Sequence, residues 1–165
     1  AYPGEVRPEY VTPAVVKLLA EFCANRTISI GTQAATDRLI AAAGRGHTAA
    51  AVEEAAALLA DAGFIPIIDY LFGMPGETRE DRSAQLAQMA RLIARARVRV
   101  QGHYFMPLPD TPWMGIAPVE PEREYLEELR RYTRGGRLQG DWEEQRLQAH
   151  RMAAWQREWL AAPAR

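Results

Sequence analysis

Cysteine is almost absent from this sequence, and its scarcity excludes several classes of site. The single cysteine, Cys23, rules out a disulfide within the chain and is typical of a protein kept in a reducing cytoplasm. One thiol also cannot complete a cysteine-rich zinc or iron–sulfur centre, which draws several thiolates from the protein. No complete site of that kind is therefore expected inside this chain.

Charge imbalance and long apolar runs are missing as well. The net charge of −1 and the pI of about 6.4 give no broad basic surface for nucleic acid or for an anionic membrane. No uncharged apolar run reaches the length of about 18 residues that spans a bilayer, and "AYPGEVRPEY" at the start lacks the apolar core of a signal peptide. We therefore expect a cytoplasmic protein that binds neither nucleic acid nor a membrane.

What the sequence does contain is an alternation of short β-like runs and longer helical runs, which favours parallel βα units. The run at 64–72 is too apolar for a one-sided sheet, so we expect it to be buried on both faces. Strands are predicted at 27–33, 64–72 and 98–106, with a further strand near 4–9. Helices are predicted at 13–22, 36–43, 48–62, 78–93, 121–133 and 141–160.

Polar side chains recur on one face of each predicted strand. Because ligand sites in parallel α/β folds gather at the carboxyl ends of strands, such a face is typical of a lumen that holds a polar ligand. The alternative is that Gln33 and His103 are satisfied polar residues of the core and that Asp69 pairs with a neighbour. The residues that share a face are Ser29, Gly31 and Gln33, then Ile67, Asp69 and Leu71, then Arg99, Gln101, His103 and Phe105.

One short motif offers a dinucleotide-binding interpretation. The stretch "GRGHTA" (44–49) matches the G-x-G-x-x-A pattern, opens a helix and precedes Asp69 by about 20 residues. That fingerprint needs a strand immediately before it. The preceding stretch "TDRLIAAA" is a better helix former than strand former. A dinucleotide-binding α/β domain therefore stays an alternative function.

A family resemblance rests on three longer stretches. The segments "SIGTQAATDRLIAAAGRGHT" (29–48), "AGFIPIIDYLFGMPGETREDR" (62–82) and "HYFMPLPDTPW" (103–113) together resemble the later half of the radical S-adenosylmethionine (SAM) barrel. The resemblance extends to methylthiotransferases and to oxygen-independent coproporphyrinogen dehydrogenases. Two further stretches, "VRPEYVTPAVVKLL" (6–19) and "LQGDWEEQ" (138–145), are similar to the group that carries an upstream cobalamin-binding domain.

The resemblance implies an α/β fold, a partial parallel (β/α) barrel over residues 1–115 followed by a helical extension with two helices over 116–165. It also implies an enzyme that cleaves SAM reductively with a [4Fe–4S] cluster, which yields methionine and a 5′-deoxyadenosyl radical. The family holds the cluster with a C-x-x-x-C-x-x-C loop, and this sequence has no such loop. The cluster ligands are therefore expected upstream of this chain, which alone should be inactive, and cobalamin is an expected cofactor of the parent.

The resemblance also assigns roles to individual residues. Asp69 corresponds to the carboxylate that accepts hydrogen bonds from the SAM ribose, and Gln33 to a glutamine at a strand end that also reaches the ribose. Arg45 corresponds to an arginine that pairs with the SAM carboxylate. One departure is "TQAAT" (32–36), where relatives carry small polar residues near the methionine end of SAM. The stretch that corresponds to the adenine site contains His103, Phe105 and Met106.

Half a barrel implies partners. The expected partner is the missing N-terminal half of the same protein, and a second copy that pairs through exposed strand edges is the alternative. The apolar stripe of Met152, Trp155 and Trp159 is interpreted as a helix-packing surface for such a missing part. A different class of function, a non-catalytic scaffold or protein-binding module built on a degenerate barrel half, also stays open.

Several residues near the motifs are expected to have structural roles. Gly73 and Gly76 suit a turn before a helix capped by Thr78. Glu77 is expected to be a solvated charge in the first helical turn. His47 is expected to donate or accept a hydrogen bond within its loop.

Overall fold

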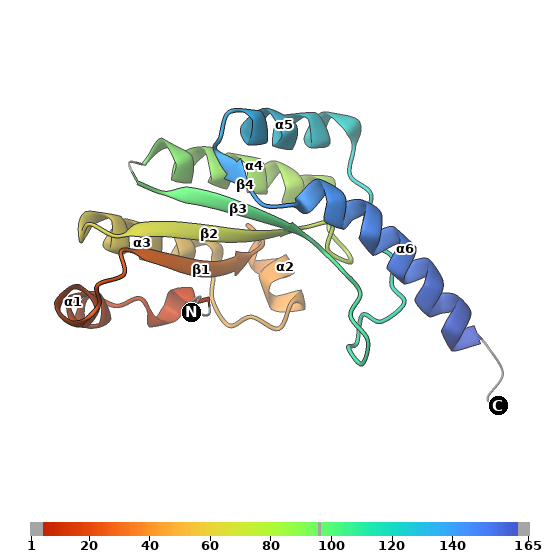
Figure 1. Cartoon of the computed structure of the whole chain (residues 1–165), viewed down its shortest axis with the longest axis horizontal. Helices are drawn as coiled ribbons and strands as arrows, with labels where there is room; N and C mark the ends of the chain where they lie inside the picture. The colour runs from red at the N-terminus through yellow and green to blue at the C-terminus, as the bar shows by residue number, and fades with distance from the viewer. Residues whose placement is uncertain (1–4, 96, 162–165) are drawn as a thin grey trace.

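Four parallel strands in one sheet form the centre of the molecule (Figure 1). The structure is a computed structural model that describes residues 5–95 and 97–161. The sheet has the order β1-β2-β3-β4, and its parallel pairing confirms the predicted α/β fold class with the three long strands near their expected positions. The strands are β1 (Thr27–Gln33), β2 (Ile65–Phe72), β3 (Arg99–Tyr104) and β4 (Leu138–Gln139).

The helices also lie close to where the sequence predicts them. Thr12, Thr48 and Thr78 each cap a helix by accepting a hydrogen bond from a backbone N–H, and Thr78 forms a capping box with Asp81. Within the described residues, no helix combines the length and the apolar character that crossing a membrane requires. The helices are η1 (Pro8–Tyr10, 3-10), α1 (Pro13–Phe22), α2 (Asp37–Ala42), α3 (Ala49–Asp61), α4 (Arg79–Ala94), α5 (Arg123–Arg134) and α6 (Trp142–Ala161).

The sheet buries one face more completely than the other. Helices α3 and α4 lie behind the strands in Figure 1, and the core there includes Ile30, Ile68 and Tyr70, all fully buried. On the opposite face Ile67 and Leu71 are only partly buried. The expectation that 64–72 is buried on both faces is therefore wrong for this chain, because the described helices cover that strand from one side.

The N-terminal segment joins the sheet through a single bridge. The Val6 N–H donates to the Ser29 carbonyl at 2.9 Å, and the Gly31 N–H donates to the Val6 carbonyl at 3.3 Å. The chain then turns into η1. Of the strand expected near 4–9, residue 4 lies outside the described residues, and the rest is a bridge rather than a strand. This bridge places the side chain of Glu5 over β1.

The strand β4 is an addition that the sequence pattern does not indicate. Its two residues pair with β3, Leu138 beside Val100 and Gln139 beside Gln101. Two residues are too short to show the alternation that predicts a strand. The segment 116–165 therefore contributes an edge to the sheet as well as helices α5 and α6, and a division of the chain at residue 115 stays a prediction.

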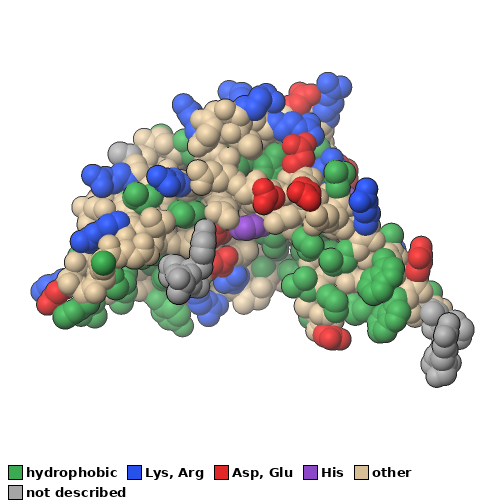
Figure 2. Space-filling view, viewed as in Figure 1, with side chains coloured by type: hydrophobic (Ala, Val, Ile, Leu, Met, Phe, Trp, Pro, Cys, Tyr) green, Lys and Arg blue, Asp and Glu red, His purple; other side chains and the backbone are tan. Residues whose placement is uncertain are grey.

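Helix α6 fixes the irregular connection that follows β3. The buried side chain of Gln156 accepts a hydrogen bond from the Gly115 N–H and donates one to the Pro107 carbonyl, both at 2.7 Å. Its other side leaves Trp155 and Trp159 exposed, and Figure 2 shows hydrophobic side chains gathered around this end of the molecule. The connection 105–118 is thus held by α6, close to the carboxyl end of β3.

Gly102 marks a point of close packing between β3 and its neighbouring strands. A Cβ at this position would lie 2.5 Å from the Phe72 ring and 3.1 Å from Leu138 Cδ1. We expect Gly102→Ala to lower the free energy of unfolding by about 1–3 kcal/mol, because the buried aromatic ring must move. Urea unfolding measures this loss. Gly46→Ala, where a Cβ meets nothing within 4 Å, is the control, and equal effects of the two changes would contradict the packing described.

Candidate functional site

Three residues form a row across the open face of the sheet. Gly31, Asp69 and Gln101 are direct partners in the parallel register of β1, β2 and β3. Gly31 and Asp69 lie past the middle of their strands, toward the carboxyl ends where sites in parallel α/β folds form, whereas Gln101 lies near the middle of β3. The other polar residues that the sequence singled out are therefore located relative to this row.

Gln33 leaves the regular ladder beside this row. The register shifts between Gly31 and Gln33, and Gln33 has a φ of 64°. A left-handed conformation is unfavourable for a residue with a side chain, and bulges of this kind redirect side chains next to active sites. Here the bulge turns the Gln33 amide toward Glu5.

Glu5 lies at the centre of the polar cluster, although sequence reasoning missed it. Its Oε2 accepts a hydrogen bond from Gln33 Nε2 at 3.1 Å and lies 3.4 Å from Arg45 Nη2. A Cβ at Gly31 would come within 2.2 Å of the same oxygen, so the carboxylate fits only above a glycine. A glycine inside a strand is the signal that could have indicated such a close approach.

Asp69 is the buried carboxylate of the cluster. Only 5% of its surface is exposed. Burial raises the pKa of Asp69 above its usual range, and the nearby charge of Glu5 adds to that rise, whereas Ser29 and His103 act in the opposite direction. A carboxylate that has lost water in this way gains from a ligand that donates hydrogen bonds to it.

The three residues predicted at the adenine site lie together on a second part of the same face. Phe105 contacts Trp113 edge to face, with ring centroids 5.3 Å apart. His103 lies beside Leu71 in the register of β2 and β3, one step beyond the row that contains Asp69. A mainly apolar depression of about 420 Å³ is lined there by Leu71, His103, Phe105, Met106, Leu108 and Trp113, among others.

The six predicted residues thus fall into two neighbouring groups. Gln33 and Arg45 meet through Glu5, and the strand pairing places Asp69 beside Gly31, under the same carboxylate. Arg45 already has a carboxylate partner in this arrangement, so a ligand carboxylate would share it with Glu5. His103, Phe105 and Met106 line the apolar depression.

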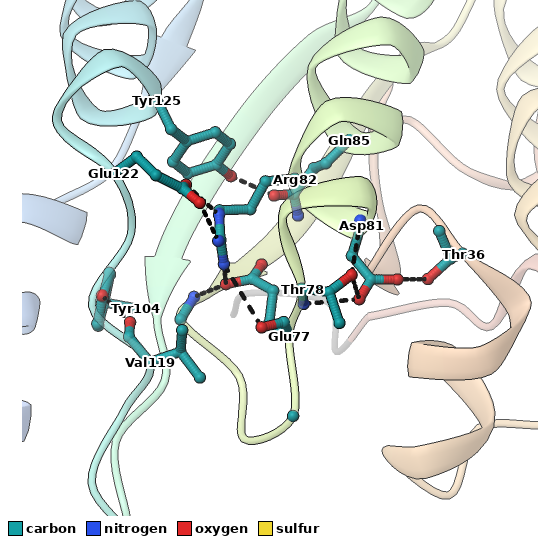
Figure 3. A network of polar contacts seen from close by, with 12 residues as sticks. Thr36, Glu77, Thr78, Asp81, Arg82, Gln85, Tyr104, Val119, Glu122 and Tyr125 are labelled. Atoms are coloured by element: carbon teal, nitrogen blue, oxygen red, sulfur yellow. Dashed lines mark hydrogen bonds and ion pairs between the residues drawn. The ribbon is translucent and has the colours of Figure 1, made fainter.

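Glu77 is buried, and the expectation that it is a solvated charge is wrong. Its Oε2 accepts a hydrogen bond from the Gly73 N–H at 3.0 Å and lies 3.7 Å from Arg82 Nη1 (Figure 3). Arg82 is held in turn by Glu122 through two hydrogen bonds of 2.7 and 2.8 Å. Glu77 precedes the N-cap Thr78 of α4 rather than lying in the first turn, and the segment before α5 covers this point, which is why the carboxyl group does not face water.

Burial also changes the titration of Glu77. It raises the pKa of Glu77 to about 7, although Arg82 and the Gly73 N–H favour the charged form and pull the pKa down. The loop after β2 therefore depends on a carboxyl group that titrates near neutral pH.

A second set of contacts fixes the other side of this loop. Asp81 accepts hydrogen bonds from Thr36 Oγ1 at 2.6 Å and from the Thr78 N–H at 2.8 Å (Figure 3). It also pairs with Arg38. Gly73 and Gly76 have φ values of 71° and 77°, as expected for turn glycines. The loop after Asp69 is therefore anchored to α2 and to the segment before α5.

The loop that carries Arg45 does not have a dinucleotide-binding geometry. The element before "GRGHTA" is α2, a helix, whereas that fingerprint follows a strand. His47 is buried, and its Nε2 lies 3.3 Å from the carbonyl of Thr32 on β1, so its hydrogen bond reaches the sheet rather than its own loop as expected. The loop therefore positions Arg45 beside the sheet. It does not form the phosphate site at a helix terminus that the dinucleotide-binding fingerprint provides.

Metal-binding groups are scarce in the part of the chain that the structure describes. No group of three or more His, Cys, Asp or Glu side chains lies close enough there to hold a metal ion. Cys23 is a free, partly buried cysteine at the end of α1. These residues therefore do not fit an iron–sulfur cluster by themselves.

Comparisons with known proteins bear on both the sequence and the fold. Residues 4–87, just over half of the chain, match the model of the radical SAM superfamily. A curated, uncharacterized protein of Methanopyrus kandleri is 26% identical over 104 residues, which cover 63% of this chain and 20% of that protein. This chain thus spans about a fifth of the length of that relative.

The fold is also similar to part of a solved structure. Elp3 of the archaeon Methanocaldococcus infernus, with an N-terminal deletion, matches with a TM-score of 0.54 and 20% sequence identity. The match covers 79% of this chain and 27% of the Elp3 chain. At this identity the likeness shows the fold alone.

The titration of Glu77 predicts how stability depends on pH. Because its pKa is raised in the folded state, the folded chain binds the proton more tightly, and stability falls as pH rises from about 4.5 through 7. We expect the unfolding free energy to be higher at pH 6 than at pH 8 by about 1 kcal/mol through this group. Glu77→Gln removes that difference in urea titrations, whereas the exposed Glu54→Gln keeps it. An unchanged pH dependence in Glu77→Gln would contradict the assignment.

Proposed function

This chain belongs to the radical SAM superfamily, and we propose that the open face of its sheet binds SAM within a radical SAM enzyme. The observation that carries the proposal is the grouping of a buried carboxylate, an exposed ion pair and an apolar depression on one face. SAM itself has a diol, a zwitterionic amino-acid end and a planar adenine. Each of these three parts has a counterpart in the arrangement.

The ion pair of Glu5 and Arg45 suits the amino-acid end of SAM. The two side chains present opposite charges 3.4 Å apart, and both are partly exposed. An α-ammonium group fits beside the Glu5 carboxylate, and a carboxylate fits the planar fork of Arg45. The pair therefore offers one partner to each charge of a zwitterion.

Asp69 suits the ribose of SAM. A carboxylate accepts hydrogen bonds from both hydroxyl groups of a diol, and such charge-assisted bonds are stronger where water is excluded. Asp69 is nearly fully buried and lies under Glu5 in the polar row. Gln33, turned toward the same point by its bulge, supplies a further amide for the ribose.

The apolar depression suits the adenine. Its volume of about 420 Å³ falls within the range of small-molecule sites, and its lining combines an imidazole, an aromatic ring and a thioether from His103, Phe105 and Met106. Planar rings pack well against such groups. This part of the proposal extends the site from β2 to the connection after β3.

The cluster of such an enzyme needs ligands that the described residues do not supply. We therefore propose that a [4Fe–4S] cluster is held by a part of the protein outside this chain. In agreement with this proposal, the match covers only 20% of the Methanopyrus kandleri relative. The cluster and SAM together supply a 5′-deoxyadenosyl radical for hydrogen abstraction. The residues of this chain bind and orient SAM. The resemblance of its sequence to cobalamin-linked proteins adds cobalamin as a proposed cofactor of the parent.

The outer edge of β1 suggests the partner of this chain. Within the described residues, β1 has only the Val6 bridge on its outer side, so that edge can accept further strands. We propose that the N-terminal half of the same protein completes the barrel there, with a second copy as the alternative partner. A scaffold without catalytic activity is a second candidate function. Measuring SAM binding distinguishes the enzyme from the scaffold, because a scaffold does not require a buried Asp69 beside Glu5 and Arg45.

The site is tested by SAM titration of the complete protein with its cluster reconstituted. Asp69→Ala removes two charge-assisted hydrogen bonds, so SAM affinity should fall on the order of 100-fold. Arg45→Ala should weaken binding as well, and Arg45→Lys should recover only part of the loss because the planar fork is missing. The exposed changes Asp61→Ala and Arg151→Ala are charge-matched controls. Equal SAM affinity in Asp69→Ala and Asp61→Ala would refute the site.

A separate test concerns iron. We expect anaerobic reconstitution of this chain alone with iron and sulfide to give no stable cluster at one per chain, because a single thiol cannot hold one. Absorption spectra and iron analysis after desalting measure the outcome. A cubane cluster that survives desalting and depends on Cys23 would show that the ligands are not supplied from elsewhere.

A further inference from the structure

A second depression lies at the opposite end of the sheet, where β3 and β4 begin. It has a volume of about 450 Å³, and no acidic residue lines it. On β3, Arg99 of this depression lies two residues before Gln101 of the polar row and four before His103, about 7 and 13 Å along the strand. Figure 2 shows Lys and Arg side chains gathered at the end of the molecule where β3 begins. The lining includes Ile93, Val98, Tyr132, Arg95, Arg97, Arg99 and Arg137.

The arginines of this depression are brought together at an electrostatic cost. Val100 pairs with Leu138 in the parallel register, so Arg99 on β3 and Arg137, the residue just before β4, lie close to each other. Like charges side by side on adjacent strands are destabilising. Arg95 and Arg97 add two more positive charges from the connection between α4 and β3.

These arginines differ from others on the surface because they are scarcely paired. Arg91 pairs with Glu53 and Arg130 with Glu143, each within 2.7 Å. Around the depression, the described residues supply one carboxylate within 4 Å, Asp61, which lies 3.9 Å from Arg95.

One further contact of these guanidinium groups involves Arg97. Arg97 donates a long hydrogen bond to the Gly63 carbonyl, and its φ of 72° holds it in a conformation that is unfavourable for a residue with a side chain. Arg99 and Arg137 have no ion pair among the described residues. The structure thus maintains a positive cluster in a chain whose net charge is −1.

We propose that this depression binds a small organic ligand that carries two or more phosphate groups. Guanidinium groups match phosphate oxygens with paired hydrogen bonds, and four of them suit more than one phosphate. Ile93, Val98 and Tyr132 give the organic part of the ligand a partly apolar floor. A bounded depression of this volume suits a small molecule.

The experiment is calorimetric titration of the chain with pyrophosphate and with ADP at physiological salt. Binding of one or both should weaken at least tenfold in the double variant Arg99→Ala/Arg137→Ala. The control Arg79→Ala/Arg151→Ala removes the same charge from exposed positions outside the depression and should bind within twofold of the unchanged chain. Arg99→Lys/Arg137→Lys keeps the charge and should recover only part of the affinity.

Folding of the variants is checked by their melting temperatures without ligand. The temperature for Arg99→Ala/Arg137→Ala should equal or exceed that of the unchanged chain, because two repelling charges are gone. Arg137→Ala alone provides a milder change with a smaller loss of binding in the same direction. The proposal is overturned if neither compound binds the unchanged chain, or if the control weakens binding as much as the double variant. It is also overturned if only an oligonucleotide binds, since that would show a surface for a polyanion.

Discussion

The parallel pairing of β2 with β1 on one side and β3 on the other is the constraint on which the rest of the structure depends. The pairing aligns Gly31, Asp69 and Gln101 in one row, and the missing side chain of Gly31 leaves room for the Glu5 carboxylate. Because helices cover the opposite face, the polar row lies on the side where a ligand can approach. A shift of one residue in this register would turn Asp69 into the hydrophobic core.

The buried ion pair of Glu77 and Arg82 holds the loop that follows this strand. Burying a charged pair costs free energy, so this pair stabilises the loop through the hydrogen bonds that it organises. Glu77 fixes the Gly73 N–H, Arg82 reaches Glu122 before α5, and Val119 donates to the Gly73 carbonyl at 3.0 Å. Through these contacts the C-terminal helices stabilise the loop next to the candidate site. The raised pKa of Glu77 makes this support sensitive to pH near neutrality.

The two ends of the sheet have different electrostatic character although the whole chain is nearly neutral. At the carboxyl end, a buried acid and an ion pair suit a zwitterionic ligand with a diol. At the amino end, scarcely paired arginines suit phosphate groups. A net charge near zero thus does not exclude local sites of either sign.

Much of the fold could be predicted from the sequence because its signals are local. The capping residues Thr48 and Thr78, the apolar run at 64–72 and the turn glycines act within a few residues of themselves, and the structure confirms the elements that they predict. The position of Asp69 near the end of a strand follows from the same local pattern. The placement of Arg45 at the sheet depends on the loop after α2, and family resemblance rather than periodicity pointed to it.

Only the tertiary structure decided which distant residues meet. Glu5 joins Gln33 across 28 positions and Arg45 across 40, and no pattern within a short window could reveal these contacts. Glu77 has the sequence context of an exposed first turn, and it is buried because Arg82 and the segment before α5 fold over it. The pairing of β4 with β3 likewise brings Arg137 beside Arg99. The sequence by itself determined the elements and most of the candidate residues, whereas burial and long-range contact determined their charge state and their partners.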